Sequence, residues 1–134
     1  MNNTNRPASL LVVEDHPVFR KFLLSWLSRT YKVTAVRDGF EALRWLQAGN
    51  HVDAIVLDME MPRIDGYRFL ENIRYSGLHS KLPVIALTAN SVESVQQRCE
   101  GLALHAVFSK PYNPNALREA IDSAAVTPAV AIAA

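Results

Sequence analysis

Cysteine is almost absent from this 134-residue chain, because Cys99 is its only one. A single cysteine excludes an intrachain disulfide and any metal site built from several thiolates. The apolar runs are strand-sized and fall far short of the ~20 residues that a membrane-spanning helix needs. The N-terminus is polar and lacks the apolar stretch of a secretion signal. We therefore expect a cytoplasmic protein without a membrane segment.

An excess of charge of either sign is missing as well. The chain has 14 lysines and arginines against 13 aspartates and glutamates, so its formal net charge is +1. This balance argues against a protein that holds nucleic acid by bulk charge, and no direct contact with nucleic acid is expected. Arg63, Arg68 and Arg74 are expected to form an ordinary solvated surface.

Glycine is scarce, and its five positions form no phosphate-binding loop. Neither G-x-G-x-x-G nor G-x-x-x-x-G-K-[ST] occurs, which disfavours a nucleotide-binding enzyme. No serine lies in a G-x-S-x-G segment, so the nucleophile elbow of a hydrolase is absent. The four histidines lack the spacing of metal ligands. These absences leave the acidic residues as the main carriers of chemistry.

Short apolar runs alternate along the chain with amphipathic patterns of helical period. The runs predict strands at 10–13, 32–36, 54–57, 84–87 and 106–108, and the periodic segments predict helices at 18–28, 40–48, 67–75, 92–102 and 115–125. Continuous apolar strands between amphipathic helices are typical of a parallel sheet covered on both faces. We therefore predict one doubly wound α/β domain of five strands and five helices, with Asn115 capping the last helix.

Polar side chains follow four of the predicted strands at the point where each strand ends. Glu14 and Asp15 follow the first strand, Asp58 the third, Thr88 the fourth, and Lys110 comes shortly after the fifth. In an open parallel sheet, ligands bind beyond the carboxyl ends of the strands. These five side chains are therefore expected to meet at one edge of the sheet.

Three neighbouring carboxylates repel one another unless a cation compensates their charge. Hard oxygen ligands in small number suit Mg²⁺ better than Zn²⁺, and a magnesium ion held by two carboxylates is typical of phosphoryl chemistry. Lys110 and Thr88 could contact further phosphoryl oxygens. Asp58 then has two candidate roles, as a metal ligand and as the nucleophile that forms an aspartyl phosphate.

The residues at these strand ends match a known family. Four segments resemble the receiver domain of two-component response regulators, in order and spacing over roughly residues 9–125: Glu14-Asp15, 57–66 around Asp58, Thr88-Ala89 and Lys110-Pro111. The stretches 14–17 and 82–90 look most like receivers attached to hybrid sensor histidine kinases. The resemblance implies a flavodoxin-like sheet of strand order 2-1-3-4-5. The composition of the two ends predicts a flexible N-terminal segment at 1–8 and a tail or the start of a linker at 126–134.

The resemblance also implies a magnesium site. Asp15 and Asp58 would ligate Mg²⁺ through their carboxylates, Glu60 through its backbone carbonyl, and Glu14 through a metal-bound water.

The family's phosphorylation residues carry over in the same way. Asp58 would accept the phosphoryl group, Lys110 would pair with it, and Thr88 would move to hydrogen-bond it. Ala89 is small, so that the group fits, and Pro111 would follow a cis peptide bond.

The implied partners are a sensor histidine kinase or histidine phosphotransfer protein as donor, and a downstream protein or attached output domain. A second copy of the chain is a further candidate partner. The domain is expected to be no enzyme in the ordinary sense, but a Mg²⁺-dependent acceptor that phosphorylates itself and loses the group slowly. The domain could also be part of a longer hybrid histidine kinase, and this alternative stays open.

Val107 departs from the family pattern, which has tyrosine or phenylalanine three residues before the lysine. Phe108 lies one position further on and faces the other side of its strand. A pseudo-receiver, which keeps the fold without switching, is therefore an alternative. A second alternative is a phosphatase of the haloacid dehalogenase type, because Asp58 and Glu60 imitate that family's acidic pair, although on the third strand instead of the first.

Overall fold

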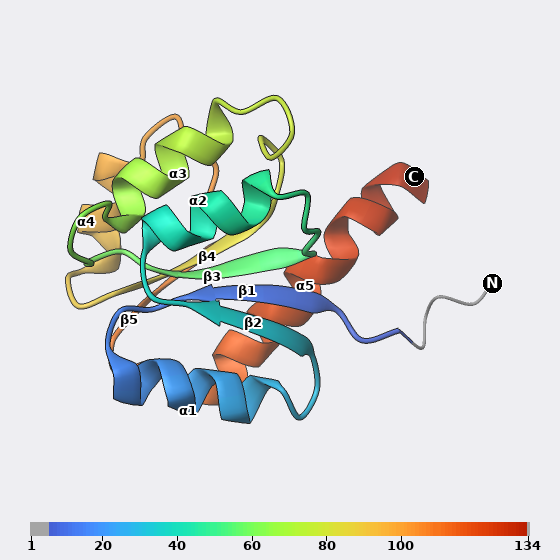
Figure 1. The fold of residues 1–134 in the computed structure, drawn as a ribbon, viewed down its shortest axis with the longest axis horizontal. Coiled ribbons are helices and arrows are strands. Elements are labelled where there is room, and N and C mark those ends of the chain that lie inside the picture. Colours follow the sequence, from blue (N-terminus) through green and yellow to red (C-terminus); the bar gives the residue numbers. More distant parts are fainter. Residues whose placement is uncertain (1–5, 134) are drawn as a thin grey trace.

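The computed structural model describes residues 6–133, of which 126–133 are described by their backbone alone. Five short strands form one parallel sheet in the order β2-β1-β3-β4-β5, as predicted (Figure 1). Residues 1–5 of the segment expected to be flexible lie outside the described residues. The strands are β1 (Ser9–Val13), β2 (Lys32–Val36), β3 (Ala54–Asp58), β4 (Val84–Thr88) and β5 (Ala106–Ser109).

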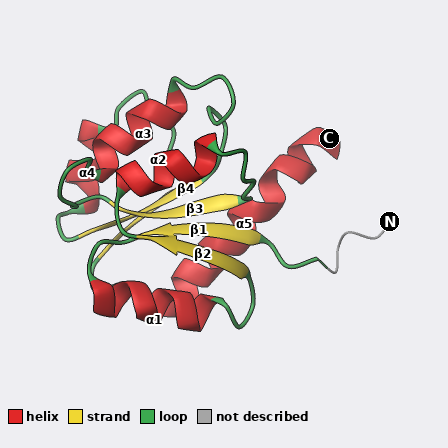
Figure 2. Ribbon diagram, viewed as in Figure 1, coloured by secondary structure: helices red, strands yellow, loops and turns green. Residues whose placement is uncertain are grey.

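A helix follows each strand, and the five helices cover both faces of the sheet. Figure 2 shows α1 and α5 on one face and α2, α3 and α4 on the other. Among the described residues, no helix combines the length and apolar character needed to cross a membrane. The helices are α1 (Pro17–Leu27), α2 (Gly39–Gln47), α3 (Gly66–Arg74), α4 (Val92–Arg98) and α5 (Pro114–Ala133).

The apolar strands bury side chains on both faces, which is why they read as continuous apolar runs. Leu11 and Ile55 belong to a core beneath α2, α3 and α4, whereas Leu10 and Val56 belong to a core beneath α1 and α5. Each fully buried aliphatic side chain of this kind stabilises the fold by roughly 1.5–3 kcal/mol. The sheet is therefore the rigid element that places the residues at its carboxyl edge.

Side-chain caps begin three of the helices. Asp38, Asp65 and Ser91 accept hydrogen bonds from the first turns of α2, α3 and α4. The predicted cap of the last helix is wrong. Oδ1 of Asn113 accepts hydrogen bonds from the backbone of Asn115 and Ala116, at 2.8 and 3.1 Å, because α5 begins at Pro114 and Asn113 directly precedes its first turn.

Two helix ends differ from the sequence-based expectation. Helix α4 ends at Arg98 instead of 102, since Cys99 leaves the helical conformation and Gly101 adopts a φ of 86°. Glycine has no Cβ and adopts such positive φ values readily. Helix α5 continues to Ala133 instead of ending at 125.

Candidate functional site

Three carboxylates meet at the carboxyl edge of the sheet, where β1 and β3 end side by side. One carboxylate oxygen from each of Glu14, Asp15 and Asp58 lies within 4.8 Å of the other two. Glu14 is 1% exposed and Asp58 2%, while Asp15 is half-buried. The register pairs Val13 with Leu57, so the residues that follow them are adjacent in space. The sequence-based expectation that these residues converge agrees with the structure.

Asp58 is electrostatically strained in the absence of a cation. Burial raises its pKa to about 7, and the charge of Glu14 adds to that rise. The ammonium group of Lys110 and a hydrogen bond from the Glu60 amide act in the opposite direction. A divalent cation among these oxygens would offset the cost of burying the charge and the repulsion between the carboxylates, so the residues present fit a hard metal ion.

Lys110 brings a positive charge to the same cluster from the end of β5. Its Nζ lies 3.4 Å from Oδ1 of Asp58 and 3.6 Å from Oε1 of Glu14. The Lys110 backbone amide donates to the Thr88 carbonyl at 2.7 Å, and the Lys110–Pro111 peptide bond is cis, as the resemblance implied. The lysine is thus attached to β4 through its backbone while its side chain reaches the acidic cluster.

The side chain of Glu60 turns away from the acidic cluster and binds the end of β4. Its Oε2 accepts a hydrogen bond from the Thr88 hydroxyl at 2.7 Å, and its Oε1 accepts one from the Ala89 amide at 2.8 Å. Asn90 Nδ2 also donates to Oε2, at 3.2 Å. The Glu60 backbone amide meanwhile donates to Oδ1 of Asp58 at 3.1 Å. The sequence-based expectations for Glu60 are a metal-binding carbonyl and a place in an acidic pair with Asp58, but no local pattern predicts that its side chain binds the end of β4.

The loop after β3 is held close to the strand by Gly66. A Cβ at this position would lie 2.6 Å from Cα of Met59 and 2.8 Å from the carbonyl oxygen of Asp58. The Gly66 amide donates to the Met59 carbonyl at 3.1 Å. The glycine is therefore a packing requirement of the site.

Two of the arginines that were expected to be solvated hold loops in place. Arg63 forms an ion pair with the buried Asp38. Arg74 donates to the carbonyls of Ala103 at 2.8 and 3.0 Å and of Leu82 at 2.7 Å, and burial lowers its pKa. The expectation of a plain solvated surface is wrong for Arg74, which is half-buried. Arg63 is solvated as expected, with 58% of its side chain exposed, but it also pairs with a buried carboxylate.

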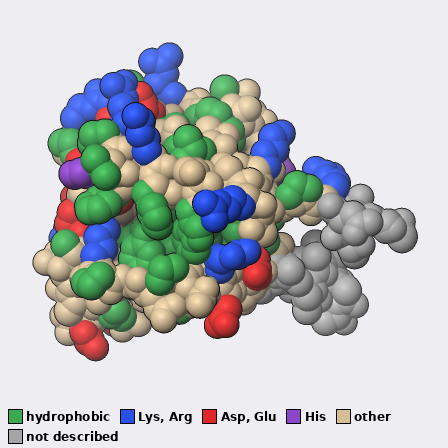
Figure 3. All heavy atoms as spheres, turned by 90° about the horizontal axis from the view of Figure 1, so that it is seen from below, with side chains coloured by type: hydrophobic (Ala, Val, Ile, Leu, Met, Phe, Trp, Pro, Cys, Tyr) green, Lys and Arg blue, Asp and Glu red, His purple; other side chains and the backbone are tan. Residues whose placement is uncertain are grey.

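An apolar groove of about 610 Å³ adjoins the acidic cluster, between α1 and the start of α5. Val18, Phe19 and Phe22 line it and are 64%, 50% and 52% exposed. Glu14 and Lys110 line it too, so the groove and the cluster share a border. Figure 3 views the molecule from the side of α1 and shows hydrophobic side chains gathered on this surface.

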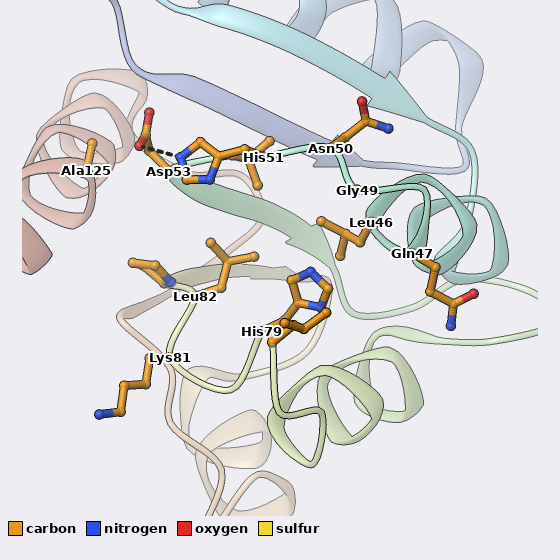
Figure 4. A pocket seen from close by; sticks show the side chains of 13 residues that line it. Leu46, Gln47, Gly49, Asn50, His51, Asp53, His79, Lys81, Leu82 and Ala125 are labelled. Atoms are coloured by element: carbon orange, nitrogen blue, oxygen red, sulfur yellow. Dashed lines mark ion pairs between the residues drawn. The ribbon is translucent and has the colours of Figure 1, made fainter.

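A second cavity, of about 620 Å³, lies at the opposite end of the sheet, beside the starts of β3 and β4. Figure 4 shows His51, His79 and Lys81 around it, with Nε2 of His51 lying 3.5 Å from Oδ1 of Asp53. The length of the strands separates this cavity from the acidic cluster, so it takes no part in the site.

The fold and the acidic edge define the doubly wound class of α/β domain that binds its ligand beyond the strand ends. The family model "Response regulator receiver domain" matches residues 10–122, and the chain belongs to this family. It is a signalling domain of the two-component kind, as the resemblance indicated. Nothing in these comparisons supports the phosphatase alternative or the pseudo-receiver.

The chain is similar to curated proteins of two kinds. It is 37% identical over 118 residues to the sensor histidine kinase RcsC of Escherichia coli K12, covering 87% of this chain and 12% of that protein. It is 36% identical over 114 residues to the response regulator Rre1 of Synechocystis, covering 83% of this chain and 48% of that protein. The chain thus spans about an eighth of one relative and half of the other.

Solved structures show the same likeness. One is the signal receiver domain of a histidine kinase from Syntrophus aciditrophicus, with a TM-score of 0.81, 27% identity, and 90% of this chain and 91% of that chain covered. Another is the receiver domain of a sensor histidine kinase from Pseudomonas aeruginosa PAO1, described with a magnesium ion in its active-site cleft. Its TM-score is 0.79 at 31% identity, covering 89% of this chain and 98% of that chain.

Proposed function

We propose that Asp58 is the phosphoacceptor of this receiver domain, and that it takes its phosphoryl group from a phosphohistidine on a partner protein. The observation that carries this proposal is the position of Asp58 itself. Its carboxylate lies within 4.8 Å of those of Glu14 and Asp15, and 3.4 Å from Nζ of Lys110. An acidic nucleophile beside a metal-binding acidic pair and a fixed cation suits phosphoryl transfer.

Mg²⁺ is the cofactor that fits the site best. The carboxylates of Asp15 and Asp58 and the backbone carbonyl of Glu60 would hold it directly, and Glu14 would act through a bound water. When bound, the ion neutralises the acidic cluster and the charge on the transferring phosphoryl oxygens. Burial, and after it the charge of Glu14, raises the pKa of Asp58, and a bound cation would offset both effects.

In the transfer step, a carboxylate oxygen of Asp58 attacks phosphorus in line with the donor imidazole. The new O–P bond forms as the P–N bond breaks, and the electron pair returns to the imidazole nitrogen, which takes up a proton from solvent. Lys110 pairs with one phosphoryl oxygen, and Thr88 donates its hydroxyl proton to another. Ala89 is exposed and offers only a methyl side chain, which leaves room for the group.

The donor has to contact the border of the site, because Asp58 is 2% exposed. The apolar groove of Val18, Phe19 and Phe22 shares Glu14 and Lys110 with that border. We infer that a sensor histidine kinase or histidine phosphotransfer protein covers this groove with apolar side chains while its histidine reaches Asp58. We also propose that the reaction takes place in the cytoplasm, as expected for a two-component signalling domain.

The signalling unit that we propose comprises residues 9–125, with 126–134 as a tail or linker toward another segment. The phosphorylated domain would act on a downstream protein or an attached output domain, and homodimerisation stays a prediction. The aspartyl phosphate would be lost slowly through hydrolysis, without turnover of an external substrate. These assignments rest on the family and on the likeness to both hybrid kinases and response regulators.

Incubation with acetyl phosphate and Mg²⁺, followed by intact-mass spectrometry, tests the proposal. The wild-type chain should gain the mass of one phosphoryl group, and chelation of the metal should abolish the gain. Asp58→Asn should gain nothing, whereas the matched control Asp53→Asn, just before the opposite end of β3, should behave as wild type. A wild-type chain that gains no mass, or an Asp58→Asn chain that gains it equally, would show the assignment to be wrong.

A further inference from the structure

The side chain of Glu60 occupies the Thr88 hydroxyl, which a phosphoryl group on Asp58 would need, and the backbone amide beside it. The Thr88 hydroxyl has one hydrogen, and it points to Oε2 of Glu60 at 2.7 Å. The Ala89 amide has one hydrogen, and it points to Oε1 of Glu60 at 2.8 Å. Each donor can serve only one strong acceptor at a time. A phosphoryl group can therefore bind these donors only after the Glu60 carboxylate has left them.

The contact between Glu60 and Thr88 is partly buried and is supported by several hydrogen bonds, although it lies at the edge of the sheet. Glu60 is half-buried and Thr88 is fully buried. Asn90 adds a third donor to the carboxylate at 3.2 Å, and its own amide donates to Oγ1 of Thr88 at 2.9 Å. Hydrogen bonds to an ionised carboxylate are stronger than bonds between neutral groups. The cluster therefore holds the end of β4 and the loop that follows it in one arrangement.

We propose that the Glu60 carboxylate is an internal competitor of the phosphoryl group, a latch that holds Thr88 and Ala89 in the unphosphorylated arrangement. The inference rests on the proposed function of Asp58 and adds a regulatory element to that site. A carboxylate imitates two of the three free phosphoryl oxygens in charge and in hydrogen-bond acceptance. Phosphorylation must break the bonds to Glu60 before it gains its own, so the latch lowers the affinity of the site for the group.

The charge of Glu60 works in the same direction as its hydrogen bonds. Once displaced, the carboxylate would still be tethered two residues from Asp58, close to a second anion. Repulsion between the two would then favour movement of Glu60 away from the end of β4. The loop from Glu60 to Gly66 therefore has two arrangements, selected by which anion Thr88 binds.

Beryllofluoride, which imitates a phosphoryl group on an aspartate, tests the latch at equilibrium. We would titrate it in the presence of Mg²⁺ against the ¹⁵N-labelled chain and follow the amides of Thr88, Ala89 and Asn90. Glu60→Ala should lower the half-saturating concentration roughly tenfold or more, since the competing charge-assisted bonds are gone. Glu60→Gln retains one acceptor oxygen, so its half-saturating concentration should lie between those of wild type and Glu60→Ala. Glu93→Ala removes an exposed charge from the first turn of α4 and is the matched control.

A second measurement needs neither metal nor beryllofluoride. The Ala89 amide should exchange its hydrogen roughly tenfold faster in Glu60→Ala than in wild type, because its acceptor is missing, and at the wild-type rate in Glu93→Ala. Unchanged exchange would overturn the latch. Equal gains in beryllofluoride affinity for Glu60→Ala and Glu93→Ala would overturn it too, because the effect would be one of net charge.

The failure of the latch is distinguishable from the failure of the proposed function. If wild type binds beryllofluoride at Asp58 and Glu60→Ala binds it no better, only the latch is overturned. If neither chain binds it, and Asp58→Asn gives the same spectra as both, the phosphoacceptor assignment fails and the latch fails with it.

Discussion

Arg63 forms an ion pair with Asp38 across 25 residues of sequence, joining the loop after β3 to the start of α2. Nε of Arg63 donates to Oδ2 of Asp38 at 3.1 Å, and Nη2 donates to the same oxygen. Asp38 is 5% exposed and also caps α2 through the Glu41 amide at 2.9 Å. Burial opposes ionisation of Asp38, but the bonds from Arg63 and Glu41 outweigh it and lower its pKa. The loop beside the acidic cluster is therefore anchored to a neighbouring helix.

Removing that anchor should destabilise the fold. Arg63→Ala leaves a buried carboxylate with only the helix amides as donors, and should lower the free energy of unfolding by about 1 kcal/mol. Arg68→Ala, on the exposed side of α3, is the control and should change it by less than about 0.5 kcal/mol. Urea denaturation measures the unfolding free energy of both variants, and an equal loss in Arg63→Ala and Arg68→Ala would contradict the role given to Arg63.

Gly66→Ala should disturb both stability and the metal site. Its Cβ would lie 2.6 Å from Cα of Met59, so the backbone beside Asp58 must shift. We expect a loss of roughly 1–3 kcal/mol in unfolding free energy and weaker Mg²⁺ binding. Gly77→Ala is a matched control, since a Cβ there meets nothing within 4 Å. Denaturation and magnesium titration should show lower stability and weaker Mg²⁺ binding for Gly66→Ala than for Gly77→Ala. Equal stability and equal Mg²⁺ affinity in the two variants would rule out the packing argument.

Asp58→Asn should stabilise the protein when no divalent cation is present. The substitution keeps Oδ1 as an acceptor for the Glu60 amide and removes the charge that Glu14 repels. We expect a gain of about 1 kcal/mol in unfolding free energy at neutral pH. Added Mg²⁺ should stabilise wild type by binding its folded state. The difference in unfolding free energy between Asp58→Asn and wild type should then become smaller or change sign. Thermal melts with and without the metal test this, and a large loss in the variant would contradict it.

Tyr31 should make the protein sensitive to alkali. Burial, followed by a hydrogen bond from Tyr31 Oη to Asp122 Oδ1 at 2.5 Å and the charge of Asp122, raises the Tyr31 pKa to about 12. Between pH 10 and 12 the unfolded chain loses this proton while the folded chain keeps it, so stability falls as the pH rises.

Tyr31→Phe removes that proton and should flatten the decline. At pH 8 the variant should be less stable than wild type by about 1 kcal/mol, through the lost hydrogen bond. The gap should narrow as the pH rises toward 12. Tyr75→Phe, at an exposed tyrosine, serves as the control. A gap that stays constant from pH 8 to pH 12 would show that the proton of Tyr31 is not involved.

Much of the fold could be predicted because it depends on local pattern. Runs such as 54–57 and 84–87 are apolar throughout, and such strands have to be buried on both faces. Once the strands are parallel, the residues after their carboxyl ends share one edge, so the convergence of Glu14, Asp58 and Lys110 follows. Asn113 replaced Asn115 as the cap of α5 because both residues are competent, and the choice between them depends on where the chain turns.

The amino-acid sequence alone therefore determined the class of the fold, the edge that carries the site and the residue types gathered there. The tertiary structure decided that Glu60 binds Thr88, that Arg63 reaches Asp38, and that Gly66 lies against Met59. The physical reason is the separation along the chain over which each effect acts. Periodicity records which face of an element is buried, whereas the partner of a long side chain depends on distances between segments that only packing of the whole domain brings together.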